Sequence, residues 1–124
     1  MRVLGSGPGA VKAAQSLQLE RDDLPSPMEA SYVAVLEGPG AWAGWRSLVE
    51  MGVEPLALVA LHVPSAVLAR MAPQAPPIVV GIPDQWQLQA ALEAGNDAKK
   101  TEMWERQARL ESYLASASAK GGNN

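Results

Sequence analysis

Three short apolar runs constrain the fold of this chain more than any other feature of its sequence. They lie at residues 31–36, 55–63 and 78–82, and stretches with helical spacing separate them. The second run lacks the polar–apolar alternation of a half-exposed strand, which is typical of a strand buried on both faces of a parallel sheet. We therefore predict an α/β fold, with a small parallel three-layer sheet in which these runs lie side by side and point the same way.

The segments around these runs complete the prediction. Residues 2–5 favour a short strand, whereas residues 9–20 and 41–51 show helical spacing. Pro64-Ser65 opens a short helix that continues to Ala72, because proline needs no hydrogen bond at the first helical position. Residues 21–30 hold two prolines and two aspartates, so we predict a loop or an extended arm there.

The C-terminal part of the chain is predicted to be mostly helical. Asp84 can cap a helix that runs to Ala94, and Gly95-Asn96-Asp97 is expected to stop it and cap a second helix, over residues 98–119. We accordingly divide the chain into an α/β domain (1–96), a C-terminal amphipathic helix (97–120) and a disordered tail (121–124).

Composition excludes several classes of function. Ten basic and 13 acidic residues give a net charge of −3, which argues against a protein that grips nucleic acid through phosphate contacts. The absence of cysteine excludes disulfides and thiolate chemistry. No apolar run reaches the length of roughly 18 residues that a membrane span needs. We expect a cytoplasmic protein without a membrane partner, or a virion protein if the chain is encoded by a phage.

A glycine-rich turn is the first motif that can carry a function. Residues 5–10 read Gly-Ser-Gly-Pro-Gly-Ala, the G-x-G-x-x-A pattern, between a predicted strand and a predicted helix. In this setting Gly5, Gly7 and Ala10 let the backbone approach a pyrophosphate at the helix N-terminus. Residues 3–10, taken with the strand that ends in Glu37, resemble the opening of FAD- and NAD-binding oxidoreductases. The resemblance implies a Rossmann-like fold and a small dinucleotide-binding module.

A second candidate site lies at the predicted carboxyl edge of the sheet. Glu37, His62 and Asp84 all follow predicted strands, and ligands bind at this edge of open parallel sheets. They are candidate catalytic residues, and two carboxylates there can hold Mg²⁺. Residues 31–95 resemble the Toprim domain of primases, topoisomerases and related nucleases, with Glu37-Gly38 as the first acidic element and Asp84 in the second. The resemblance implies a Mg²⁺-binding acidic pair, although Trp86 stands where that family has another aspartate.

The third candidate is the C-terminal helix as a surface for protein contacts. Five positions, all apolar except Gln107, follow a 4-3-4-3 rhythm flanked by Trp104 and Tyr113, and aromatic residues are favoured anchors of interfaces. The members of this rhythm are Met103, Gln107, Leu110, Leu114 and Ala117. We expect interface contacts by Trp104, Leu110, Tyr113 and Leu114, made with a protein partner or by self-association, unless the helix docks on its own domain.

These observations leave three hypotheses for function. The first is a non-catalytic interaction or structural subunit of a larger assembly, without a cofactor; a component of a phage virion or of its assembly is one concrete form. The second is a degenerate Toprim-like nucleic-acid-processing domain that binds Mg²⁺. The third is the small dinucleotide-binding module. The first is preferred because the sequence shows no nucleophile–base pair and no phosphate-binding P-loop motif, and gives no reason to expect a small-molecule ligand.

Overall fold

A five-stranded parallel sheet forms the centre of the computed structural model, which describes residues 1–29 and 31–122, with side chains up to Ala115. Across the described residues the strand order is β2-β1-β3-β4-β5, and every neighbouring pair is parallel. The strands are β1 (Arg2–Leu4), β2 (Arg21–Asp22), β3 (Tyr32–Glu37), β4 (Ala57–Leu61) and β5 (Ile78–Val80). The three apolar runs thus lie side by side and point the same way, which confirms the predicted α/β fold.

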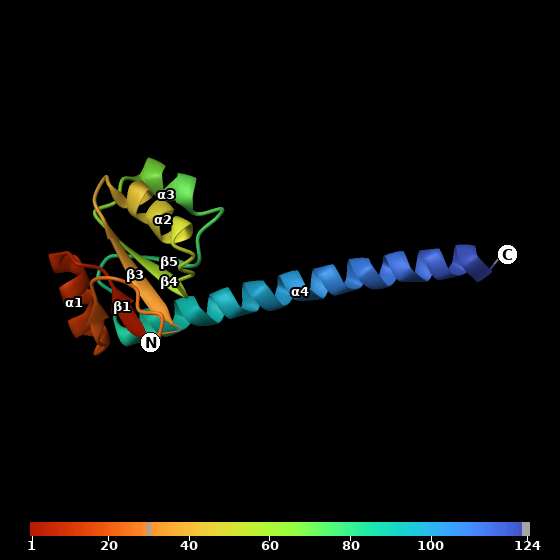
Figure 1. Ribbon diagram of the computed structural model, residues 1–124, viewed down its shortest axis with the longest axis horizontal. Coiled ribbons are helices and arrows are strands. Elements are labelled where there is room, and N and C mark those ends of the chain that lie inside the picture. Colours follow the sequence, from red (N-terminus) through yellow and green to blue (C-terminus); the bar gives the residue numbers. More distant parts are fainter. Residues whose placement is uncertain (30, 123–124) are drawn as a thin grey trace.

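Helices cover both faces of this sheet and create the predicted three layers (Figure 1). The helices of the described chain are α1 (Pro8–Leu17), α2 (Ala41–Glu50), α3 (Ser65–Met71) and α4 (Gln85–Gly122). Helix α1 and the first turns of α4 pack on one face, and α2 and α3 pack on the other. Each face therefore has its own apolar core, and the sheet separates the two.

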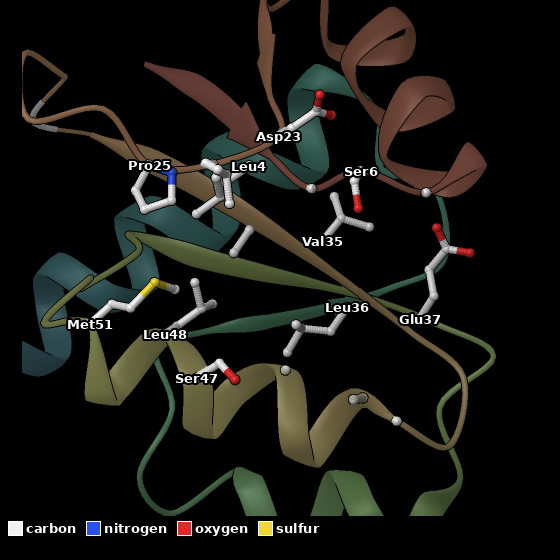
Figure 2. A pocket seen from close by; sticks show the side chains of 17 residues that line it. Leu4, Ser6, Asp23, Pro25, Val35, Leu36, Glu37, Ser47, Leu48 and Met51 are labelled. Atoms are coloured by element: carbon white, nitrogen blue, oxygen red, sulfur yellow. The ribbon is translucent and has the colours of Figure 1, made fainter.

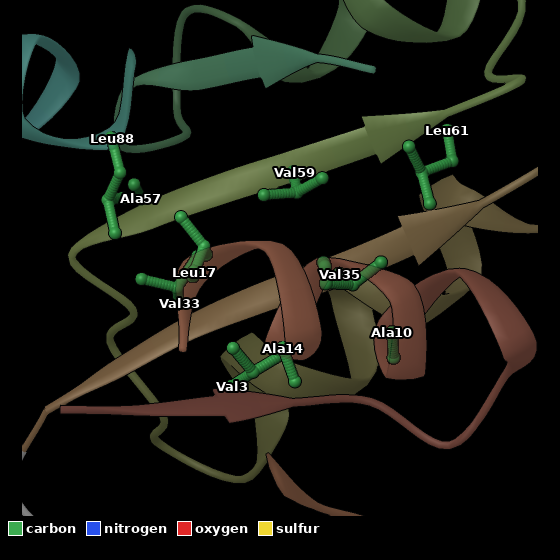
Figure 3. Packing of buried hydrophobic residues seen from close by; sticks show 11 residues of the cluster. Val3, Ala10, Ala14, Leu17, Val33, Val35, Ala57, Val59, Leu61 and Leu88 are labelled. Carbon is green, nitrogen blue, oxygen red and sulfur yellow. The ribbon is translucent and has the colours of Figure 1, made fainter. Parts of the chain in front are cut away.

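Alternation along the strands divides the apolar side chains between these cores. In β3, Val33 and Val35 face α1, whereas Ala34 and Leu36 face α2 and α3. Figure 3 shows the first cluster, in which α1 contributes mainly alanines and can lie close to the sheet. Because both faces are buried, β3 and β4 need apolar residues at consecutive positions, which explains the continuous runs in the sequence.

The segment predicted as an arm contains a strand that the sequence analysis missed. Arg21 and Asp22 form β2, which pairs in parallel with Val3 and Leu4 of β1 at the edge of the sheet. The prediction of a loop or arm over residues 21–30 is therefore wrong at its start. Two residues carry no periodicity, so this strand depends on hydrogen bonds to β1, such as the one from the Val3 amide to the Glu20 carbonyl (2.8 Å).

The predicted break between two C-terminal helices is also wrong. Helix α4 runs without interruption through Gly95-Asn96-Asp97 and continues past the expected end at residue 119. Gly95 costs the helix about 1 kcal/mol relative to alanine, but a Cβ atom there would lie 2.9 Å from Cγ of Pro77. The glycine therefore permits close packing against the domain. Of the predicted tail, Gly121 and Gly122 belong to α4, and residues 123–124 lie outside the described residues.

Helix α4 begins beneath the sheet and then extends away from the domain as a single helix (Figure 1). At a rise of 1.5 Å per residue, its 38 residues span about 57 Å. Every residue from Asn96 to Ala115 is exposed. No helix in the described part of the chain has both the length and the apolar character required to cross a membrane.

Candidate functional sites

The glycine-rich turn and Glu37 come together where the strand order changes direction. The chain leaves β1 through α1 toward one edge of the sheet and leaves β3 through α2 toward the other. In doubly wound sheets the carboxyl ends of two such strands border a crevice. Here β1 leads into Gly5-Ser6-Gly7, and β3 ends in Glu37, so two residue sets predicted from the sequence meet at this crevice.

The Glu37 carboxylate occupies the N-terminus of α1. Its Oε1 atom accepts a hydrogen bond from the Gly9 amide at 2.9 Å, and a Cβ atom on Gly7 would lie 2.7 Å from the same oxygen. A carboxylate at this position satisfies a free amide of the first turn and interacts favourably with the helix dipole. The glycines therefore accommodate a side chain of the protein itself at the place where the dinucleotide fingerprint would hold a phosphate.

The remaining glycine and alanine of the motif serve close packing. Gly5 has a φ of 157°, and a Cβ atom on it would lie 2.8 Å from Cβ of Ala10. Ala10 is completely buried in the core under α1. The assignment of Gly5, Gly7 and Ala10 to a cofactor stays a prediction, and the contacts within the chain account for these residue types without one.

Asp84 lies at the other end of α1 from Glu37. Its Oδ1 accepts a hydrogen bond from the Gln87 amide (2.7 Å), and the Gln87 side chain accepts one from the Asp84 amide (2.9 Å), a reciprocal cap of α4. The adjacent Pro83 carbonyl accepts a hydrogen bond from Ser16 near the C-terminus of α1. Ser16 and Gly9 are about 10 Å apart along the helix axis, so the structure does not bring the two carboxylates together.

His62 follows β4 and is exposed in a left-handed conformation, with a φ of 54°. Among the residues whose positions are described, no group of three or more histidines, aspartates and glutamates is placed to hold a metal ion. The roles of Glu37, His62 and Asp84 in metal binding or catalysis stay predictions, whereas their local bonds identify Glu37 and Asp84 as helix caps.

A pocket at the crevice was not predicted from the sequence. It has a volume of about 550 Å³ and lies between the ends of β1 and β3 and the inner side of α2 (Figure 2). Leu36, Leu48 and Met51 supply apolar walls, and Ser6 and Ser47 supply hydroxyl groups. The serines and Met51 are distant in sequence and belong to no motif, so only the known position of the switch point in doubly wound sheets could have indicated this pocket.

A polar network that joins β1, β2 and β3 was also not predicted from the sequence. The Arg2 guanidinium makes two hydrogen bonds of 2.7 Å to the Asp22 carboxylate, and the Tyr32 hydroxyl donates a third at 3.1 Å. The hydrogen bonds from Arg2, with that from Tyr32, hold the pKa of Asp22 below its usual value of 3.8, although partial burial opposes the shift. The Ser26 amide donates to the Tyr32 hydroxyl (2.7 Å), so the network also fastens the loop after β2.

The four tryptophans divide between the core and the surface. Trp45 is buried under α2, and Trp42 packs against Arg70, whose guanidinium carbon lies 4.0 Å from the ring centre. Trp86 and Trp104, both on α4, are 84% and 74% exposed. One small core therefore does not accommodate all four indoles, and α4 carries those that it leaves out.

The exposed part of α4 forms an apolar strip on one side of the helix. We define the α4 stripe as Met103, Gln107, Leu110 and Leu114. Its three apolar members are 51–68% exposed, and the neighbouring Trp104 and Tyr113 are at least 70% exposed. The alternative, docking of this helix on its own domain, does not occur from Met103 to Ala115, where every side chain is exposed. Ala117 continues the rhythm but lies outside the residues whose side chains are described.

Comparisons of the chain with protein-family models, with curated proteins and with solved structures found no match.

Proposed function

We propose that this protein is a non-catalytic interaction subunit that uses the exposed part of α4 to bind another protein chain. The carrying observation is that α4 leaves its domain and holds the α4 stripe, with Trp104 and Tyr113, in water. An isolated helix gains little stability in water, because most helical stability in proteins comes from packing of an apolar face. Exposed apolar surface of this kind is typical of protein–protein contact sites.

In this proposal the α/β domain orients α4, and the exposed part of α4 binds the partner. The α/β domain fixes the start of α4 through Leu88, which is 7% exposed, and through Gly95 against Pro77. Because α4 is one continuous helix, the domain sets the direction in which the α4 stripe is presented. A partner therefore meets the α4 stripe in an orientation that the domain sets.

A pull-down followed by reconstitution tests this function. Affinity-tagged full-length protein is isolated from the cells that produce it, and the proteins recovered in stoichiometric amount are identified and purified, additional copies of the chain included. Binding is then measured for the wild type, for Leu110→Glu/Leu114→Glu and for Ser112→Glu. Ser112 lies about 180° from Met103 around the helix and is exposed, so it is a matched control.

We expect the double substitution to weaken binding about 100-fold, which corresponds to about 2.7 kcal/mol, because it places two charges in the interface. Ser112→Glu should change the affinity less than about threefold. In dilute solution without a partner, both variants should keep the thermal unfolding temperature of the domain. A partner that binds all three proteins equally, or the absence of any partner, would contradict the proposed function.

The Toprim-like alternative has a separate test. If Glu37 is a helix cap and not a metal ligand, Glu37→Ala should lower the unfolding temperature by the same amount with and without millimolar Mg²⁺. Stabilisation of the wild type by Mg²⁺ that disappears in Glu37→Ala and in Asp84→Ala would instead favour the acidic pair. The positions of these carboxylates at opposite ends of α1 are the reason why we place this hypothesis second.

A further inference from the structure

The α4 stripe has the spacing of a coiled-coil seam. Its members follow one another at intervals of four, three and four residues, which is the alternation of a and d positions in a heptad. Met103 and Leu110 then occupy d positions, and Gln107 and Leu114 occupy a positions. A seam of this kind fits another helix with the same repeat better than a flat surface, because each side chain inserts between four residues of the facing helix.

The two sides of the α4 stripe carry opposite charges. Lys99 and Arg106 lie along the side of the g positions, whereas Asp97 and Glu111 lie along the side of the e positions. All four residues are exposed, and the polar contacts of Arg106 and Glu111 are to Glu102 and Gln107 within the same helix. The g side of one helix faces the e side of the other only when two helices run parallel, and like sides face each other when they run antiparallel. A g residue faces the e residue five positions later in a parallel partner, so Arg106 and Glu111 are the charges that complement a parallel copy of the same helix.

We propose that α4 forms a parallel, in-register coiled coil with α4 of a second copy of this chain. The inference rests on the proposed function and names the partner. Arg106 of each chain faces Glu111 of the other, and Lys99 lies beside the Trp104 ring of the other chain, where a cation–π contact can form. Gln107 meets its own counterpart at an a position, and a polar residue at one a position specifies the register of the pair.

Pairing begins at Lys99, where α4 leaves its domain. Leu92 and Gly95 line a hollow together with Pro77, and Lys99 still borders the loops of the same domain. The side of α4 that faces its own domain up to Lys99 is near the side that carries the α4 stripe further along the helix. The two domains of a dimer must therefore lie apart at the start of the paired segment, so that both fit beside the coiled coil. Two copies of the stripe with their flanking aromatic rings offer on the order of 1,200 Å² of surface, the lower end of the range for specific interfaces.

Single-cysteine variants of the full-length chain test this pairing directly, because the chain contains no cysteine. Leu114→Cys places a thiol where a parallel dimer brings residue 114 of both chains together, and Ser112→Cys places one on the outer side as a control. Disulfide formation is followed under mild oxidation at micromolar concentration. Light scattering after size-exclusion chromatography gives the mass of the wild type, of Leu110→Glu/Leu114→Glu and of Ser112→Glu.

The expected result is a wild-type mass twice the chain mass of 13.1 kDa at high concentration, with rapid cross-linking of Leu114→Cys only. The double glutamate variant should return to the chain mass, and Ser112→Glu should not. A monomer at all concentrations overturns the inference. An antiparallel dimer also overturns it: in a mixture of Leu114→Cys with a further variant, Met103→Cys, such a dimer would cross-link residue 114 to residue 103 and would not cross-link residue 114 to itself.

The failure of this inference differs from failure of the proposed function. If the chain is monomeric but a different purified protein binds it and loses affinity about 100-fold on Leu110→Glu/Leu114→Glu, the second copy is the wrong partner and the function stands. If the chain is monomeric and no protein depends on the α4 stripe, both proposals fail.

Discussion

Glu37 shows how a residue type that suggests chemistry can serve a structural purpose. Its carboxylate accepts the Gly9 amide, and the absence of a side chain at Gly7 leaves room for it. From the sequence, the same glycines and the same acid indicated a dinucleotide site. The pattern is ambiguous because a phosphate and a carboxylate are both anions, and the N-terminus of a helix stabilises either of them.

A double-mutant cycle between Gly7 and Glu37 checks this contact. Gly7 has an extended backbone with a φ of −81°, so an alanine there is strained only by its contact with the Glu37 carboxylate. We expect Gly7→Ala and Glu37→Ala each to lower the free energy of unfolding by about 1 kcal/mol. The double variant should lose about 1 kcal/mol less than the sum. Additive losses, measured by urea denaturation, would show that the two residues do not interact.

The Asp22 carboxylate makes the free energy of unfolding depend on pH in the acid range. Because the Arg2 hydrogen bonds lower the pKa of Asp22 in the folded state, its stabilising effect is complete above the usual pKa of 3.8. That effect is lost as the pH falls from about 4 through the lowered value. Asp22→Asn should therefore be less stable than the wild type at pH 7, and the difference should shrink below pH 4. Urea denaturation between pH 7 and pH 2.5 measures the free energy of unfolding of both proteins, and a difference that stays constant over this range would contradict the prediction.

At the scale of the elements, the two parts of α4 lie in different environments, one packed on the domain and one exposed to water. Its first turns belong to the core, where Leu88 contacts the cluster that contains Ala57 and Leu17. Beyond Asn96 the described side chains are all exposed. The 4-3-4-3 spacing from Met103 onward predicted a helix with one apolar side, whereas the exposure of that side and the continuity through Gly95 could not be predicted. The reason for a glycine within this helix is its close contact with Pro77, 18 residues earlier in the sequence.

Two identical substitutions on α4 distinguish these environments. Leu88→Ala should reduce the free energy of unfolding by about 2–4 kcal/mol at every chain concentration, because it opens a cavity in the core. Leu110→Ala should cost less than about 0.5 kcal/mol in dilute solution. Its cost should grow as the concentration rises, because association stabilises the folded chain by mass action. Thermal unfolding at several chain concentrations measures both effects, and a large constant cost at Leu110 would show that it is covered within the single chain.

For the whole molecule, the projecting helix predicts an elongated shape. A compact chain of 124 residues has a radius of gyration of about 14 Å, and a helix of about 57 Å that leaves one side of the domain must raise it. Small-angle scattering of the Leu110→Glu/Leu114→Glu variant, in which pairing is disrupted, should give a value well above 14 Å with a long tail in the distance distribution. A value near 14 Å would mean that α4 folds back on the domain.

The sequence by itself determined the layers of this protein. Apolar residues at consecutive positions in 31–36 and 55–63 favour burial on both sides, which a parallel sheet with helices on both faces provides. It also determined the 4-3-4-3 face of the C-terminal helix, because helical spacing is a local property. The tertiary structure decided the rest: the pairing of β2, the partner of Glu37, the separation of Glu37 from Asp84, and the exit of α4 from the domain. Each of these depends on contacts between residues far apart in the chain, and no local pattern specifies such contacts.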